Sequence, residues 1–144
     1  MVICADTSFL FALYGNDAHT RRALTWSRTS RTPLTVSELT DYELGNALRF
    51  AEFRKVLRAG QAAMFWAQYL SDQAAGRVAL EVCNLARVIA HAKRLSATYT
   101  PRGGHRGFDI LHVAAALELK AVEFLTFDAN QKKLVEAEGL IVPV

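Results

Sequence analysis

Acidic residues of this 144-residue chain stand where side chains can do chemistry. Asp6 follows a short apolar segment, Glu38 and Glu43 follow a second one, and Asp128 follows a late one, while Asp109 comes after a segment that contains glycines. A helix cap explains Asp6, Asp109 or Asp128 taken singly, because a carboxylate accepts hydrogen bonds from the free N–H groups of a helix N-terminus. Several carboxylates in one crevice repel one another unless a cation joins them. Mg²⁺ or Mn²⁺ suits such oxygen ligands, and in a basic protein this kind of site suggests a phosphate-ester substrate.

The elements that must position these acids follow from the apolar pattern. Strands are predicted at residues 2–5, 34–36, 78–82, 122–127 and 140–144, and helices at 9–14, 17–31, 59–75, 85–95, 109–120 and 128–138, with a further helix beginning at Ser37 or Thr40. Residues 96–107, which include Pro101, are predicted to form a loop. Short, continuously apolar strands that alternate with helices indicate an α/β fold with a parallel sheet. Since ligands bind beyond the carboxyl ends of such strands, Asp6 and Asp128 should face one crevice.

Composition limits the class of protein. With 51% hydrophobic and 22% charged residues, the chain is not intrinsically disordered, and its length suits one domain spanning residues 1–144. The net charge of +3 is compatible with a polyanionic partner. Cys4 and Cys83 lie in apolar segments and are expected to pack as free thiols, with no zinc-type spacing. We expect a cytoplasmic protein, because neither a signal peptide nor a membrane span is recognisable.

Four segments resemble the motifs of the PIN-domain family, in the family's order. They are Asp6-Thr7-Ser8; Thr35 to Leu48; Gly107 to Ala116; and Phe124 to Asp128 with the Asn130-Gln131 and Gly139-Leu140 that follow. Asp-Thr-Ser alone is a weak motif. Four acids in order, each in its proper element, make a specific one, and the match spans almost the whole chain.

The resemblance implies a metal-dependent ribonuclease, most similar to the VapC toxins of bacterial VapBC toxin–antitoxin pairs. It implies a three-layer α/β/α sandwich around a central parallel sheet of about five short strands. It also implies that RNA is the substrate, that the protein is a homodimer, and that a cognate antitoxin inhibits it. One or two Mg²⁺ or Mn²⁺ ions would be bound by an acidic quartet that is both catalytic and metal-ligating: Asp6, Glu43, Asp109 and Asp128. Thr7 and Thr126 match hydroxyl positions beside the site.

Several assignments stay open on the sequence. Glu38 and Asp41 lie near Glu43 and are rival acids, although the family pattern favours Glu43. His112 lies three residues after Asp109, nearly on the same helical face, yet its apolar neighbours favour a core or helix-surface histidine. Arg102, His105 and Arg106 are candidate RNA contacts, or simply solvated charges of the predicted loop.

Two other functions are weighed against the nuclease. A catalytically inactive PIN-like scaffold would bind RNA or protein only, although all four acids are present. A phosphotransfer domain also places Asp and Mg²⁺ at a strand end, but its Asp-x-Asp pair, or its double acid with a late lysine, is missing. The apolar run Ala62 to Ala67, with Tyr69 and Leu70, suggests that a second protomer or an antitoxin covers part of this helix.

Overall fold

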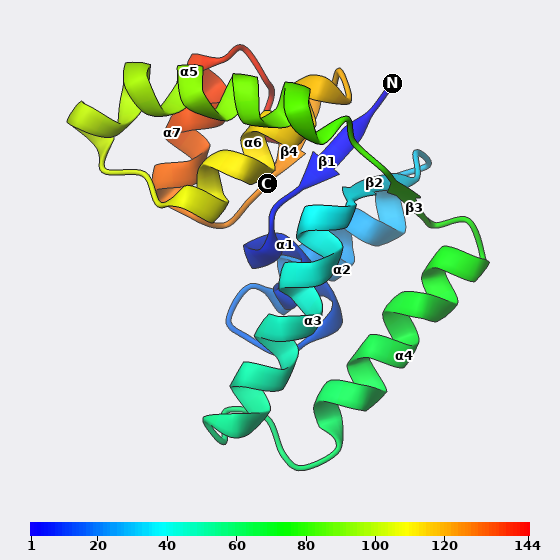
Figure 1. Ribbon diagram of the computed structural model, residues 1–144. Helices are drawn as coiled ribbons and strands as arrows, with labels where there is room; N and C mark the ends of the chain where they lie inside the picture. Colours follow the sequence, from blue (N-terminus) through cyan, green and yellow to red (C-terminus); the bar gives the residue numbers. More distant parts are fainter.

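The computed structural model describes all residues, 1–144, as four strands and seven helices (Figure 1). In chain order the elements are β1 (Ile3–Ala5), α1 (Thr7–Tyr14), α2 (Thr20–Thr29), β2 (Leu34–Ser37), α3 (Glu38–Phe53), α4 (Gln61–Ala74), β3 (Val78–Glu81), α5 (Leu85–Gly103), α6 (Gly107–Glu118), β4 (Glu123–Leu125) and α7 (Ala129–Ala137). No helix is long and apolar enough to cross a membrane.

The sheet is entirely parallel, with the strand order β3-β2-β1-β4. β1 and β4 are neighbours in register, and Ala5 pairs with Leu125. Both strands therefore end at the same edge, one residue before Asp6 and three before Asp128. The predicted strand at 140–144 is reduced to a single bridge between Ile141 and Glu123, so the sheet has four strands and not about five.

Helices cover both faces of the sheet, which confirms the three-layer α/β/α class (Figure 1). Side chains alternate along β1, because successive residues of a strand point to opposite faces. Ile3 and Ala5 join a buried cluster with α1 to α4, whereas Cys4 joins a second cluster with α5, α6 and α7. Cys4 and Cys83 are free thiols, and both are buried.

The prediction of a loop at residues 96–107 is wrong, because α5 continues to Gly103 and passes through Pro101. Proline lacks an N–H and disfavours helical geometry in the residue before it, which is why the sequence suggested a break. Tertiary contacts override that preference. The Tyr99 hydroxyl donates to Glu138 at 2.5 Å, and Arg94 also pairs with Glu138, so the last turns of α5 are tied to the end of α7. The helix then ends at Gly104, whose φ of +62° is a left-handed cap that glycine adopts readily.

Candidate active site

A cavity of about 420 Å³ opens beyond the carboxyl ends of β1 and β4. The four acids of the predicted quartet all line it, although they come from α1, α3, α6 and α7 or the residues just before them. The remaining lining residues are Thr7, Ser8, Phe11, Asp17, His19, Ala47, Arg106, His112 and Phe127. The fold therefore brings together carboxylates that are up to 122 residues apart in the chain, Asp6 and Asp128 being the outermost pair.

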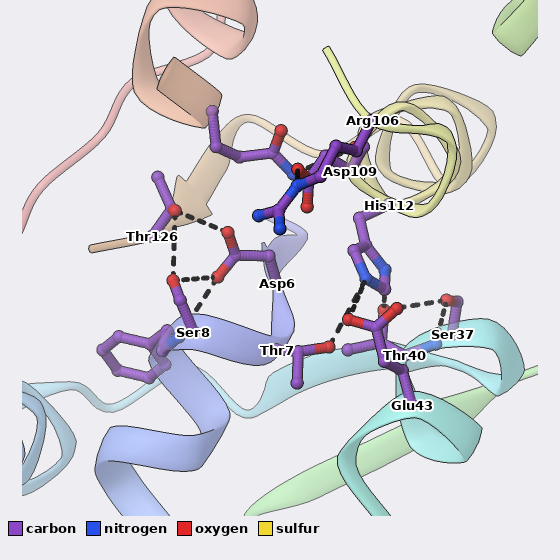
Figure 2. A network of polar contacts seen from close by, with 12 residues as sticks. Asp6, Thr7, Ser8, Ser37, Thr40, Glu43, Arg106, Asp109, His112 and Thr126 are labelled. Carbon is purple, nitrogen blue, oxygen red and sulfur yellow. Dashed lines mark hydrogen bonds and ion pairs between the residues drawn. The ribbon is translucent and has the colours of Figure 1, made fainter. Parts of the chain in front are cut away.

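Asp6 is the most deeply buried of these acids, with 3% of its surface exposed. It caps α1: its Oδ1 accepts hydrogen bonds from the Phe9 N–H at 3.1 Å and from the Ser8 hydroxyl at 2.6 Å. Its Oδ2 accepts from the Thr126 hydroxyl at 2.5 Å (Figure 2). Burial raises the pKa of Asp6, although these three hydrogen bonds oppose the rise. Thus both oxygens are held in place, but no cationic side chain is bonded to them.

Glu43 lies against a buried histidine. The Nε2 atom of His112 is 3.2 Å from Glu43 Oε1, and His112 is only 2% exposed. Partial burial would raise the pKa of Glu43, but the hydrogen bond and charge of His112, helped by Thr7 and Arg106, outweigh it, so the pKa is lowered. His112 is thus a buried residue of α6, as the apolar run suggested, and it also contacts a site acid.

A chain of hydroxyl groups holds the other side of the His112 ring (Figure 2). The Thr40 N–H donates to Ser37 Oγ at 3.3 Å, and the two hydroxyls lie 3.3 Å apart. The Ser37 hydroxyl can then donate to Thr40 Oγ1, which leaves the Thr40 proton for His112 Nδ1 at 2.9 Å. In this arrangement Nδ1 of the neutral His112 ring accepts the Thr40 proton, so the ring's own proton is on Nε2. In the doubly protonated ring, Nε2 also carries a proton. In either state His112 donates to Glu43.

Asp109 and Asp128 are more accessible than Asp6. Asp109 accepts from Arg106 Nε at 3.2 Å, in an ion pair whose arginine side chain is 81% exposed. Asp128 caps α7 by accepting from the Gln131 N–H at 2.9 Å. The Gln131 side chain is fully buried and donates to the Asp109 carbonyl at 2.9 Å, so it connects the start of α7 to α6.

The rival acids near Glu43 have structural partners elsewhere. Glu38 accepts from the Cys83 N–H at 3.0 Å, beyond the end of β3, and Asp41 accepts from the Tyr69 hydroxyl at 2.8 Å. Neither lines the cavity, so the structure places Glu43 there and not its neighbours.

The three candidate RNA contacts do not stay together. Arg106 lines the acidic cavity, whereas Arg102 and His105 line a separate cavity of about 340 Å³ between the end of α5 and α7. Arg102 lies in the last turn of α5 and His105 in the short turn that follows, and the Asn130 side chain of α7 lies 3.3 Å from the His105 ring. Of the hydroxyl residues, Thr126 is bonded to Asp6, and Thr7 lies 3.4 Å from His112 Nε2.

A divalent cation fits the chemistry of this donor set. Carboxylate oxygens are the ligands that Mg²⁺ and Mn²⁺ prefer, and a buried carboxylate without a bonded cation gains from one nearby. However, no three Asp, Glu, His or Cys side chains form a ready-made metal cluster. Glu43 is paired with His112 and Asp109 with Arg106, so these two carboxylates would exchange partners on binding the ion.

Two hydroxyl residues that support the site were missed from the sequence, one bonded to an acid and one to His112. Ser8 bonds Asp6, lies 3.3 Å from the Thr126 hydroxyl and accepts from the Phe127 N–H at 3.0 Å, which ties α1 to the end of β4. Thr40 orients His112. Both stand inside the recognised motif segments, but only the folded chain shows which hydroxyl points at which acid.

The fold and the acidic cavity define an α/β protein of the PIN class. Residues 3–137 match the PIN domain, so the chain belongs to the PIN-domain family. A sequence search of curated proteins gives no match.

Solved structures with the same fold include toxins and toxin–antitoxin complexes. VapC20 of Mycobacterium tuberculosis, described as a sarcin–ricin loop cleaving toxin, superposes with a TM-score of 0.70 at 21% identity over 96% of both chains. VapBC2 from Rickettsia felis, bound to a promoter DNA fragment, gives 0.67 at 15% identity over 99% of this chain and 97% of that one. VapBC-1 from nontypeable Haemophilus influenzae gives 0.63 at 18% identity, over 95% and 94%.

Proposed function

We propose that this protein is a metal-dependent endoribonuclease that hydrolyses RNA phosphodiester bonds. The observation that carries the proposal is the meeting of Asp6, Glu43, Asp109 and Asp128 on one cavity at the end of a PIN-type sheet. A single acid at a strand end is a helix cap, but four around one cavity favour cation binding. The net charge of +3 supports a polyanionic substrate.

Each side chain has a part in this proposal. Asp6 and Asp109 would be the principal ligands of Mg²⁺ or Mn²⁺, with Glu43 and Asp128 completing the set directly or through water. A bound divalent cation lowers the pKa of a coordinated water and neutralises charge on the phosphate. Thr126 and Ser8 hold the Asp6 carboxylate, and His112 holds Glu43 until the ion is bound. Arg106, at the rim, would contact the phosphate backbone once Asp109 turns to the ion.

In biological terms we propose a toxin of the VapBC type, controlled by a cognate antitoxin. The likeness of fold to VapC20 and to the two VapBC complexes supports this role. The exposed apolar side chains of α4 support a protein partner: Met64 is 57% exposed and Leu70 46%. Co-expression with the product of an adjacent small reading frame, followed by light scattering, tests for a complex. A second copy of the chain on the same surface would appear as a dimer of the isolated protein.

The activity is tested with a fluorogenic single-stranded RNA in Mg²⁺, in Mn²⁺ and in EDTA. We expect cleavage with either metal, none in EDTA, and none for Asp6→Asn or Asp109→Asn. Glu136→Gln, a matched loss of one carboxylate on the exposed side of α7, should cleave like the wild type. Metal-dependent cleavage retained by both active-site variants would refute the assigned ligands. A folded wild-type protein that binds RNA without cleaving it would instead support the inactive scaffold.

A further inference from the structure

The cavity has a second wall that the proposed chemistry does not use. Besides its acids, the cavity is lined by the aromatic side chains of Phe11, His19 and Phe127, with Asp17 beside His19. We call the three aromatic residues the aromatic wall. A phosphate at such a site is bound by the cation that the carboxylates hold and by hydrogen-bond donors, so it needs no aromatic surface. The combination of acidic and aromatic walls indicates a ligand that carries both a phosphate and a flat, apolar group.

The rings of this wall are fixed in place. His19 lies parallel to Phe127, with ring centroids 4.6 Å apart and an angle of 8° between the planes. Phe127 in turn stacks on the fully buried Phe9 at 5.5 Å. The backbone at His19 is held by its N–H, which donates to Asp17 Oδ1 at 2.8 Å. A half-buried ring that is already ordered loses little conformational entropy when it stacks on a ligand.

A basic pocket adjoins the aromatic wall. It has a volume of about 180 Å³ and shares Phe127 and Asp128 with the main cavity. It also contains Arg22 and Lys132, and the guanidinium of Arg22 lies 5.2 Å from the centre of the Phe127 ring. The acidic cavity, the aromatic wall and the basic pocket are therefore adjacent, with Phe127 and Asp128 common to both cavities.

We propose that the aromatic wall is a subsite for one unpaired nucleobase next to the scissile phosphate, with His19 as its stacking residue. The basic pocket of Arg22 and Lys132 then receives the next phosphate of the strand. This inference rests on the proposed nuclease function and adds the residues that would hold one base of the strand beside the cut. A base stacked inside a duplex has no free face to offer to His19, whereas a base in a loop or a free strand has one.

The subsite is tested by binding and not by cleavage. A fluorescein-labelled ten-nucleotide RNA is titrated by anisotropy in EDTA and again with Ca²⁺ in place of Mg²⁺. His19→Leu roughly keeps the side-chain volume and removes the aromatic face, while His19→Phe keeps a flat ring without the imidazole nitrogens. His91→Leu, the same substitution on α5, is the matched control. An abasic strand of the same length and a blunt duplex serve as probes that offer no free base.

We expect His19→Leu to weaken binding of the single strand about ten-fold, and His19→Phe and His91→Leu to leave it within about three-fold of the wild type. Binding of the abasic strand and of the duplex should not change in any variant. Equal binding of the single strand by His19→Leu and the wild type would overturn the subsite, as would failure of the wild type to prefer the single strand to the abasic one. A base-dependent loss in a protein that cleaves no RNA would refute the nuclease and leave the subsite standing.

Discussion

Asp6 and Glu43 line the same cavity, but their surroundings act on them in opposite directions. Asp6 is almost fully buried among hydroxyl and amide donors, and burial raises its pKa. Glu43 is half-buried against His112, which lowers its pKa. Neutral hydrogen bonds hold a carboxylate in position without fully replacing its lost hydration, whereas a basic ring also compensates its charge. Burial of the Asp6 carboxylate therefore costs stability near neutral pH, whereas the pairing of Glu43 with His112 contributes stability.

The largest effect is expected for Asp6→Asn, which should abolish cleavage and yet stabilise the fold near neutral pH. The folded-state pKa of Asp6 lies above its unfolded value of about 3.9, so stability falls as the pH rises through the window between the two. Asparagine keeps an oxygen for the Phe9 N–H and carries no charge. We expect a higher free energy of unfolding at pH 7.5 than in the wild type, seen as a higher thermal midpoint.

Glu43→Gln supplies the contrast. Because the folded-state pKa of Glu43 is lowered, its contribution to stability is present above the unfolded value of about 4.3 and is lost as the pH falls through the folded value. The glutamine variant should therefore be less stable than the wild type at pH 7.5, and the difference should shrink as the pH falls through the folded-state pKa. If both variants shift the midpoint in the same direction at pH 7.5, the contrast between the two ends fails.

After the loss of cleavage in Asp6→Asn, the next effect in size is expected for Thr126→Val, which should lower stability. The Thr126 hydroxyl donates to Asp6 and accepts from the Asp128 N–H at 3.0 Å, so valine removes a donor from a buried carboxylate and an acceptor from a backbone amide. We expect a loss of about 1–3 kcal/mol in urea unfolding. Thr126→Ser, which keeps the hydroxyl, should lose less than half of this amount. A valine variant as stable as the wild type would show that this hydrogen bond does not support Asp6.

A smaller loss of stability is expected for Thr40→Val, at the Glu43 end of the cavity. His112 Nδ1 then loses its 2.9 Å partner, and we expect about 1 kcal/mol lower stability. Imidazole ¹⁵N chemical shifts should show the proton of the neutral wild-type ring on Nε2. In the valine variant Nδ1 can carry that proton instead. A wild-type ring protonated on Nδ1 alone would contradict the hydroxyl chain described above.

The smallest effect is expected for Arg106→Gln. Its ion pair with Asp109 has an arginine side chain that is 81% exposed, and such pairs stabilise proteins little. The thermal midpoint should stay within about 1 °C of the wild type. RNA binding, measured against salt concentration, should weaken slightly and become less salt-dependent. A clear loss of stability would mean that the pair does more than its exposure suggests.

Much of the fold could be predicted because the strands of a parallel sheet carry their signal locally. Ile3, Cys4 and Ala5 form a continuous apolar run before the capping Asp6, and Leu34 and Val36 stand just before the capping Ser37. Two errors arose where local preference and packing disagree. Pro101 suggested a break that the contacts of Tyr99 with α7 overrule, and the apolar 140–144 segment forms only one bridge.

The sequence by itself determined the alternation of strands and helices and the four acids at or soon after the beginnings of helices, because periodicity and capping act over a few residues. Only the tertiary structure decided that Glu43, and neither Glu38 nor Asp41, lines the cavity. It also decided that His112 Nε2 lies against Glu43 and that Arg102 lines a different cavity from Arg106. It also decided that His19 and Phe127, 108 residues apart in the chain, stack beside the acids. The physical reason is that hydrogen bonds and stacking act over a few ångströms between segments distant in sequence, and no local pattern records which of them meet.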